Sequence, residues 1–274
     1  IDGASTDNTV EIIHKFRDPR IQIIRHRDNR GTCEARNTGI EMAKGSWIAP
    51  IDADDAWHTE RLTKLLKIAQ HYPDAFIGSD VMICLSGRNN ELIPWRTFFE
   101  DRKLKTDYLF HPKPAEFVRY GLDVKPIFPR EVLQKHNIRF LSEFEYHEWL
   151  IFLLRLYAAG LKYVIVNEPL YYYRLRHDSS STSYRSICSQ LKGCTYLLSR
   201  DWIDQETRKI IKKGMKITRH RGLTLALQKK LWAKALKQAI LSPLSIVYLL
   251  RVLPAWILRQ REFRKLLRNK GNKG

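Results

Sequence analysis

The sequence is poor in cysteine, and its few cysteines follow no metal-binding pattern. The 274 residues include four cysteines, with neither Cys-x-x-Cys pairs nor histidines at the spacing of a zinc site. We therefore expect free thiols, as in a reducing compartment, and no structural zinc. Internal repeats and low-complexity tracts are absent as well. Because 44% of the residues are hydrophobic, a disordered chain is excluded.

Acidic residues are nearly missing from the last quarter of the chain. Residues 207–274 contain 19 lysines and arginines against the single Glu262, whereas residues 1–206 contain 29 against 28 acids. The net charge of +19 therefore belongs to the C-terminal part. We expect a near-neutral globular domain at residues 1–180 and a basic helical extension at residues 181–274.

Short apolar runs alternate with helical patterns in the N-terminal part, which predicts an α/β domain with a mostly parallel sheet and helices on both faces. A mobile loop is expected at Ser86–Lys105, because this stretch mixes glycine, asparagine and charges with aromatic residues. The other expected elements are a helix after Thr6 or Asp7, a strand at Ile21–Arg25, a helix at Cys33–Ala43, a strand at Trp47–Ile51, a helix after Thr59, a strand at Ala75–Ser79, helices at Pro129–His136 and Glu145–Gly160, a strand at Lys162–Val166, and helices from Ser183 onward.

A cluster of acids follows the expected strand at Trp47–Ile51, in the string IAPIDADDAW. Ligands of open α/β folds bind at the carboxyl ends of strands, where this cluster lies. The carboxylates of Asp52, Asp54 and Asp55 are hard oxygen ligands for Mg²⁺ or Mn²⁺, which in turn holds a nucleotide diphosphate. A cluster that only caps the following helix is the alternative.

Two further segments have the composition of ligand-binding turns. The string DGASTDNT begins at Asp2, which can accept hydrogen bonds from a ribose or a base, although a simple capped turn explains it equally well. The string NRGTCEARNTGIEMAKG opens a helix at Gly31, with Arg36 near its start, and the free amides of such a helix can bind phosphate.

These three segments, in this order and followed by ERL at Glu60–Leu62, resemble the signature of family 2 glycosyltransferases of the GT-A fold. A weaker similarity extends to NEPLYYYRLRHDSSSTS at Asn167–Ser183, so that the resemblance covers residues 1–180. Because that family has a strand and loop before its Asp-Gly element, the resemblance also implies a chain that lacks its first strand at the N-terminus.

The resemblance implies a role for each matching residue. Asp2 would contact the nucleoside, Arg36 would lie near the donor, and Asp52 would lie near the ribose. Asp54 would bind the metal, Mn²⁺ or Mg²⁺, that bridges to the diphosphate, whereas Asp55 has no certain role. The implied reaction transfers a sugar with inversion from a nucleotide-sugar donor to a saccharide or lipid-linked acceptor, in the synthesis of cell-surface polysaccharide.

The catalytic base is expected at the start of the helix at Glu145–Gly160. The family usually has a Glu-Asp pair there, whereas this chain has His147-Glu148, with Glu148 in the place of the aspartate. A glutamate can act as the base if it reaches the acceptor hydroxyl. Glu145 and His147 are alternative bases, and His177 and Asp178 are candidates for the acceptor side.

The basic extension contains an apolar run at Ile240–Leu258 with cationic residues on both sides. Two prolines and Arg251 argue against a span of the bilayer. The pattern favours a helix at an anionic membrane surface, which implies a peripheral location on the cytoplasmic face. A plain helical extension is an alternative, and nucleic acid is not an expected partner, because counterion release would not explain the apolar run.

Two other functions remain open at this point. A non-catalytic homologue that binds nucleotides or polyanions would explain the missing Glu-Asp pair, although it gives no reason for three clustered acids. A transferase that uses a polyprenyl phosphate as acceptor would act on lipids and on no saccharide.

Overall fold

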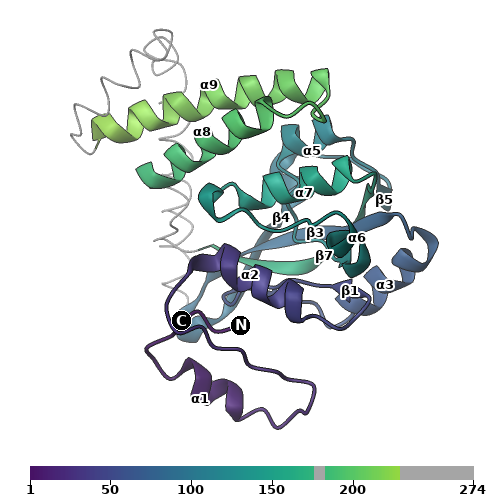
Figure 1. Cartoon of the computed structure of the whole chain (residues 1–274), viewed down its shortest axis with the longest axis vertical. Coiled ribbons are helices and arrows are strands. Elements are labelled where there is room, and N and C mark those ends of the chain that lie inside the picture. Colours follow the sequence, from purple (N-terminus) through teal and green to yellow (C-terminus); the bar gives the residue numbers. More distant parts are fainter. Residues whose placement is uncertain (176–182, 229–274) are drawn as a thin grey trace. The chain divides into compact units, whose positions relative to one another are not determined.

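The computed structural model describes residues 1–175 and 183–228, drawn in colour in Figure 1. Two compact units are present: Ile1–Ile83 with Trp95–Tyr173, and Cys84–Pro94 with the described residues from Arg174 on. The helices are α1 Thr9–His14, α2 Gly31–Met42, α3 Arg61–His71, α4 Phe98–Arg102, α5 Pro114–Tyr120, α6 Arg130–Lys135, α7 Glu148–Ala158, α8 Tyr184–Leu198 and α9 Gln205–Gln228. The strands are β1 Trp47–Ile48, β2 Ala56–Trp57, β3 Ala75–Ser86, β4 Leu92–Thr97, β5 Leu109–Phe110, β6 Phe128–Pro129 and β7 Lys162–Leu175.

The main sheet has the strand order β2-β7-β3-β4, with β5 also paired to β7. The pairs β2–β7 and β5–β7 are antiparallel. Strands β3 and β7 run in the same direction, since the Lys162 amide donates to the Asp74 carbonyl at their start, and the Ser86 hydroxyl donates to the Leu175 carbonyl at their end. The α/β class is as predicted, but the sheet is mixed rather than mostly parallel, because the short strands β2 and β5 pair antiparallel with β7.

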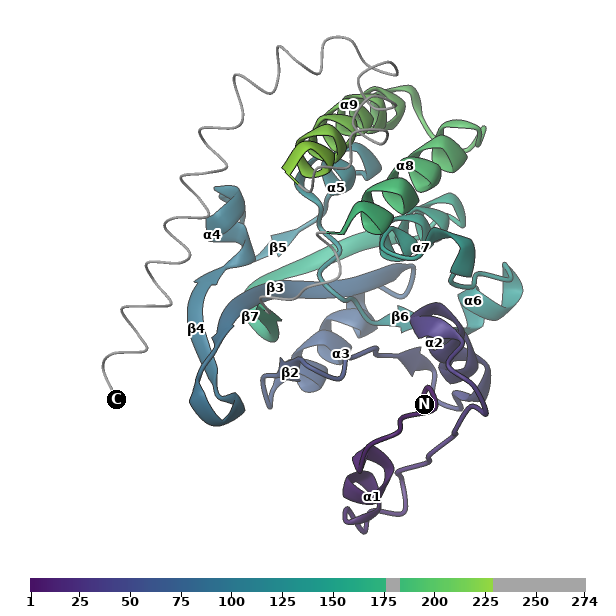
Figure 2. The same cartoon turned by 90° about the vertical axis from the view of Figure 1, so that its left-hand side faces the viewer.

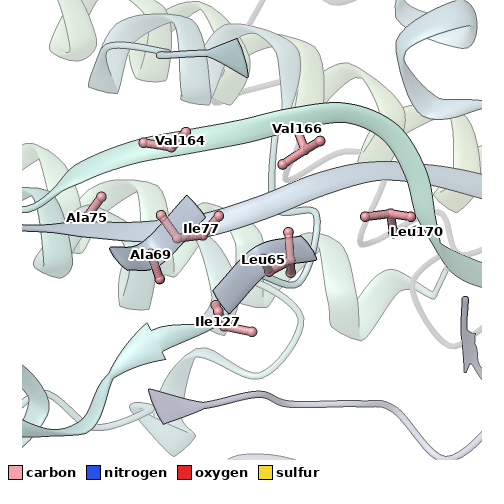
Figure 3. Packing of buried hydrophobic residues seen from close by; sticks show 8 residues of the cluster. All are labelled: Leu65, Ala69, Ala75, Ile77, Ile127, Val164, Val166 and Leu170. Carbon is pink, nitrogen blue, oxygen red and sulfur yellow. The ribbon is translucent and has the colours of Figure 1, made fainter. Parts of the chain in front are cut away.

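Helix α3 packs on one face of the sheet, and α5 and α7 lie on the other (Figures 1 and 2). Successive side chains of a strand point to opposite faces, so Ile77 faces α3 whereas Phe76 faces α7. The first face is a core of aliphatic residues around Leu65, which is fully buried (Figure 3). The cluster contains Leu65, Ala69, Ala75, Ile77, Ile127, Val164, Val166 and Leu170.

Aromatic rings fill the opposite face. Phe76 stacks on Tyr163 with ring centroids 4.3 Å apart, and the Tyr157 ring meets Phe76 edge-on at 5.2 Å. Gly78 lies beside this cluster, and a Cβ atom at this position would stand 2.7 Å from the Tyr163 hydroxyl. The glycine therefore lets a buried tyrosine approach the backbone of β3.

The N-terminal segment differs from the prediction. The residues Ile21–Arg25 form no strand, and Arg25 makes a single parallel bridge with Asp2. Helix α1 contains no buried residue, and Phe16, which follows its end, is 65% exposed. The residues Ile21–Arg25 have the composition of a strand, but the described residues provide no neighbouring strand with which they could form a ladder.

The expected mobile loop at Ser86–Lys105 is also wrong, because most of it is regular structure. Strand β4 joins the edge of the sheet, and α4 follows it directly. Thr97 and Glu100 form a capping box, in which each side chain accepts a hydrogen bond from the other residue's amide. This reciprocal cap explains how a helix of only five residues begins here.

The second unit contains α8 and α9, which pack against each other. Helices after Ser183 were predicted, and within the described residues they are present. The predicted domain boundary at residue 180, His177, Asp178 and the apolar run at Ile240–Leu258 lie outside the described residues, so the division into 1–180 and 181–274 stays a prediction. Across residues 1–175 and 183–228, no helix has the length and apolar character that a bilayer span requires.

Candidate active site

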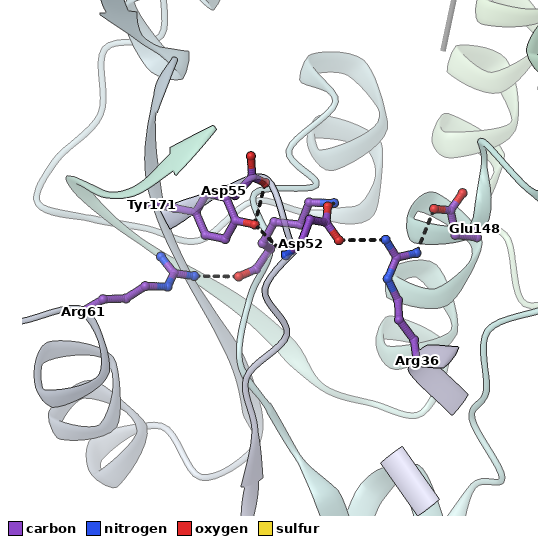
Figure 4. Close-up of polar contacts among 7 residues, drawn as sticks. Arg36, Asp52, Asp55, Arg61, Glu148 and Tyr171 are labelled. Atoms are coloured by element: carbon purple, nitrogen blue, oxygen red, sulfur yellow. Dashed lines mark hydrogen bonds and ion pairs between the residues drawn. The ribbon is translucent and has the colours of Figure 1, made fainter. Parts of the chain in front are cut away.

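The acid cluster lies in the turn between β1 and β2, and its first member is held by two cations (Figure 4). One oxygen of Asp52 accepts a hydrogen bond from Arg36 at 2.9 Å, and the other is 2.8 Å from the Lys125 ammonium group. The Asp52 side chain keeps 27% of its surface exposed. Burial raises the pKa of this carboxyl group, but Lys125 and Arg36 together outweigh burial, so that the pKa falls below its ordinary value.

Arg36 connects this aspartate to the start of α7. Its second amino group donates to Oε1 of Glu148 at 3.0 Å. The guanidinium lies 5.1 Å from the ring centre of Trp149 and 5.3 Å from that of Phe140. Burial lowers the pKa of Arg36, but the two carboxylates more than compensate and raise it overall. Arg36 is thus a charged link between Asp52 and Glu148.

The local sequence explains why α2 presents Arg36 here. Gly31 begins the helix with φ of +83°, a backbone conformation that glycine adopts without strain. The Gly31 amide donates to the Asn29 side chain at 3.0 Å. The side chain of Asn37, the next residue after Arg36, exchanges two hydrogen bonds with the backbone of Phe140. The helix is therefore fixed against the segment that leads into α7.

Glu148 is the first residue of α7, and 13% of its side chain is exposed. Its Oε2 atom makes no hydrogen bond to any residue that the structure describes, whereas Oε1 is held by Arg36. The alternative base His147 precedes the helix, and burial lowers its pKa to about 4. Of the three candidate bases, Glu148 is the one whose contact with Arg36 joins it to the acid cluster.

The later acids of the cluster face tyrosines of β7. The Tyr171 hydroxyl donates to Asp55 at 2.7 Å and accepts from the Asp52 amide at 3.3 Å. Partial burial and the carboxylates of Asp55 and Asp54 raise the pKa of Tyr173 to about 12. Asp54 and Asp55 thus lie together beside the end of the sheet, both half-buried.

The donor set suits a hard cation that is shared with a substrate. The described residues contain no group of three or more histidine, cysteine or acidic side chains arranged around one metal position. Mg²⁺ is commonly bound by one or two carboxylates, with substrate phosphates and water completing the shell. Asp54 and Asp55 supply carboxylates of this kind, whereas both oxygens of Asp52 are occupied by cations.

Asp2 is held apart from this network by its own neighbours. It is 6% exposed, and its carboxylate accepts from the Ser5 amide and lies 3.2 Å from Arg25. The hydrogen bond with Ser5 is the main cause of the lowered pKa of Asp2. The structure therefore brings Arg36, Asp52 and Glu148 into direct contact, whereas Asp2 contacts its own turn and Arg25.

Three residues of this network were missed in the sequence. Lys125 lies in a segment without a recognisable motif, and its left-handed φ of +49° has no signal in the sequence. Tyr171 was inside the quoted string at Asn167–Ser183, but which of the three tyrosines in this string contacts the acids depends on strand register. Arg61 was inside the quoted ERL string, and its burial at 1% exposure is unexpected for a charged residue.

Comparison with known protein families identifies the family whose sequence pattern this chain shares. Residues 1–121 match the family model described as Glycosyl transferase family 2. The first 121 residues therefore belong to this family. The match covers Arg36, the acid cluster and Arg61, whereas Lys125, Glu148 and Tyr171 of this family 2 glycosyltransferase lie beyond it.

A relative agrees with this assignment, and two solved structures share the fold. The succinoglycan biosynthesis protein ExoO of Rhizobium meliloti is 29% identical over 264 residues, which are 91% of this glycosyltransferase and 74% of ExoO. The structure of residues 1–349 of Staphylococcus aureus TarS in complex with UDP-GlcNAc has a TM-score of 0.58 and 16% identity, and the match covers 81% of this chain and 62% of that one. The mannosyltransferase PcManGT of Pyrobaculum calidifontis, in complex with GDP-Man and Mn²⁺, has a TM-score of 0.56 and 13% identity over 90% of this chain and 72% of that one. The GT-A fold of this family 2 glycosyltransferase is thereby confirmed.

Proposed function

We propose that the protein transfers a sugar from a nucleotide diphosphate donor to a saccharide or lipid-linked acceptor, with inversion and with a divalent metal. The observation that carries this proposal is the continuous network of Glu148, Arg36, Asp52 and Lys125, with Asp54 and Asp55 in the same turn. This network would place a base for the acceptor hydroxyl, Glu148, near the carboxylates that would bind the donor diphosphate through a metal. The similarity to ExoO, a succinoglycan biosynthesis protein, supports a role in polysaccharide synthesis.

The donor would bind at the acid cluster. Asp52 would accept hydrogen bonds from the ribose through the exposed part of its carboxylate, with Arg36 and Lys125 fixing its orientation. Asp2 would contact the nucleoside from the neighbouring turn. The named ligands of the two solved structures, UDP-GlcNAc and GDP-Man, support a nucleotide-sugar donor.

Asp54 would hold the metal, Mn²⁺ or Mg²⁺, together with the donor diphosphate. When bound, such an ion neutralises the charge that develops on the departing nucleoside diphosphate. Asp55 would support this site through the hydrogen bond from Tyr171, which orients its carboxylate. The Mn²⁺ in the PcManGT structure supports this assignment.

Glu148 would remove the proton from the acceptor hydroxyl as that oxygen attacks the anomeric carbon. Its Oε1 atom is oriented by Arg36, which leaves Oε2 for the acceptor. The C–O bond to the acceptor forms on the face opposite the departing diphosphate, and this single displacement inverts the anomeric centre. The transition state would resemble an oxocarbenium ion, as in glycoside hydrolysis.

Calorimetric titration with UDP, GDP, dTDP and CDP, each with and without Mn²⁺, tests the donor site. We expect one nucleotide to bind, and its binding to require both Mn²⁺ and Asp54. The Asp54→Ala variant should lose the metal-dependent part of the affinity. Asp101→Ala is the matched control, because Asp101 lies on α4 and pairs with Arg96 and Arg102. If none of the four nucleotides binds in a metal-linked manner, the non-catalytic function is favoured instead.

A further inference from the structure

Arg61 is a buried cation with no acidic partner among the described residues. It begins α3, is 1% exposed, and has hydrogen bonds only to neutral oxygen atoms. One amino group donates to the Ser79 hydroxyl at 2.5 Å, and the other donates to the Lys125 carbonyl at 2.6 Å. Its Nε atom is buried without a hydrogen-bond partner. A guanidinium in this setting needs an explanation, because buried charges are normally paired.

Packing alone does not explain this arginine. Burial lowers its pKa to about 10, which shows that the surroundings disfavour the charged form. An apolar side chain of similar volume often replaces a buried ionic group without loss of stability. A residue needed only to fill the space below the acid cluster would therefore not have to be an arginine.

Two of the contacts that Arg61 makes, with Lys125 and with Tyr171, lead to the acid cluster. Its hydrogen bond to the Lys125 carbonyl holds a residue in the left-handed conformation, and the ammonium group of that residue lies on Asp52. Its guanidinium also lies 5.1 Å from the ring centre of Tyr171, and the Tyr171 hydroxyl bonds both Asp55 and the Asp52 amide. Figure 4 shows Arg61 and Tyr171 on the side of Asp52 away from Arg36.

We propose that Arg61 is a positioning residue for donor binding, which acts through Lys125 and Tyr171 to orient Asp52 and Asp55. This inference rests on the proposed function, since it assigns the acid cluster to the donor. Arg61 itself touches neither the donor nor the metal. Its loss should therefore weaken donor binding and leave the proton transfer at Glu148 unaffected.

The test compares Arg61→Met with the wild-type chain in sugar transfer and in Mn²⁺-dependent nucleotide titration. We expect the donor KM and the nucleotide Kd to rise about tenfold, with kcat within about twofold, and with a midpoint of thermal unfolding close to that of the wild type. Arg61→Lys keeps the charge but cannot reach both oxygen atoms, so it should recover part of the affinity. If Arg61→Met does not fold, the donor KM of Arg61→Lys still shows whether Arg61 positions the donor site: an unchanged KM would contradict the inference.

Arg208→Met is the matched control. Arg208 donates three hydrogen bonds to the backbone carbonyls of Ile203, Leu198 and Arg200, all within the second unit. Its replacement should lower the unfolding midpoint and leave the donor KM unchanged. If Arg61→Met instead lowers the midpoint without a change in KM, Arg61 is merely structural and the inference is wrong.

A double-mutant cycle shows whether Arg61 acts through Lys125. Lys125→Met should raise the donor KM, and adding Arg61→Met to it should have less effect than Arg61→Met has alone. Full additivity would contradict the proposed connection. A wild-type chain with neither transfer nor nucleotide binding would refute the proposed function itself, whereas a fully active Arg61→Met variant would refute only the inference.

Discussion

A carboxylate that accepts a proton from a sugar hydroxyl must be oriented and must keep an oxygen free for that hydroxyl. Glu148 meets both conditions, because Arg36 holds one of its oxygen atoms at 3.0 Å. The same arginine holds Asp52, so that the expected base and the expected donor site share one cation. A change at Arg36 should therefore affect both halves of the reaction.

Replacement of Glu148 by glutamine removes the basic group and keeps the shape. The glutamine carbonyl can still accept the hydrogen bond from Arg36, so the fold and the donor affinity should stay as they are. We expect kcat to fall by about a hundredfold or more, as is typical for the loss of a general base. Steady-state kinetics with saturating donor measures this effect. Glu145→Gln serves as the comparison, and full turnover of Glu148→Gln would remove Glu148 as the base.

The charges around Asp52 make stability depend on pH. Its pKa is lowered in the folded chain, so the folded state gains stability at pH values above the ordinary aspartate pKa, and this gain is lost as pH falls through the folded-state pKa. Asp52→Asn should therefore lower the free energy of unfolding at pH 7 by about 1–3 kcal/mol. The difference from the wild type should shrink towards pH 3.

Urea denaturation at both pH values measures the difference. Asp18→Asn is the control, because Asp18 pairs with Arg20 at the exposed surface and its loss should matter less. An Asp52→Asn variant that is equally destabilised at pH 3 and pH 7 would show that the ion pairs are not the cause.

The sequence predicted some site residues and missed others for identifiable reasons. Sequence patterns mark where helices begin and strands end, and Arg36, Asp52 and Glu148 each lie close to such a position. The contact between Lys125 and Asp52 depends instead on one left-handed residue in an irregular segment. No local pattern in the sequence specifies that conformation.

Elements were predicted well where a full apolar face is buried. Helix α7 has six buried residues and was expected within three residues of its observed start. Strands were predicted less well, because a ladder depends on partners that lie far away in the sequence. Strand β3 continues to Ser86, well beyond the expected Ser79, since β7 accompanies it along its length.

The close approach of Tyr163 to Gly78 gives a prediction for strand β3. Gly78→Ala would place a methyl group 2.7 Å from a hydroxyl that is itself held by the Leu122 carbonyl. We expect a loss of about 1–3 kcal/mol in the free energy of unfolding. Gly214→Ala in α9 is the matched change, because no atom lies within 4 Å of the added carbon, and it should stabilise by up to about 1 kcal/mol. Denaturant titration measures the change in the free energy of unfolding for both variants. An unchanged free energy of unfolding in Gly78→Ala would contradict the packing argument.

At the scale of the whole molecule, charge is distributed very unevenly. Residues 207–274 contain 19 lysines and arginines and one acid, whereas the rest of the chain is nearly neutral. Within the described part of this segment, Lys209, Lys212, Lys213 and Lys216 of α9 are all exposed. We propose that this segment holds the protein at an anionic membrane surface, on the cytoplasmic face, where a lipid-linked acceptor would be present.

Sedimentation with lipid vesicles tests this association. The full chain should bind vesicles that contain phosphatidylglycerol, and should not bind vesicles of phosphatidylcholine alone. Binding should weaken between 0.1 M and 0.5 M salt, because added ions screen the attraction between basic residues and lipid phosphates. Equal binding to both vesicle types would exclude an electrostatic interaction, and preferential binding to double-stranded DNA would favour a nucleic-acid partner instead.

The left-handed backbone of Lys125 has a consequence for laboratory evolution. A non-glycine residue in this conformation costs about 1–2 kcal/mol, which glycine would recover at once. Glycine would also remove one of the two cations on Asp52, so a population of variants selected for thermal stability alone should admit both lysine and glycine at position 125. A population selected for sugar transfer should keep the lysine, so that deep sequencing of the two would separate the cost of the backbone from the value of the side chain.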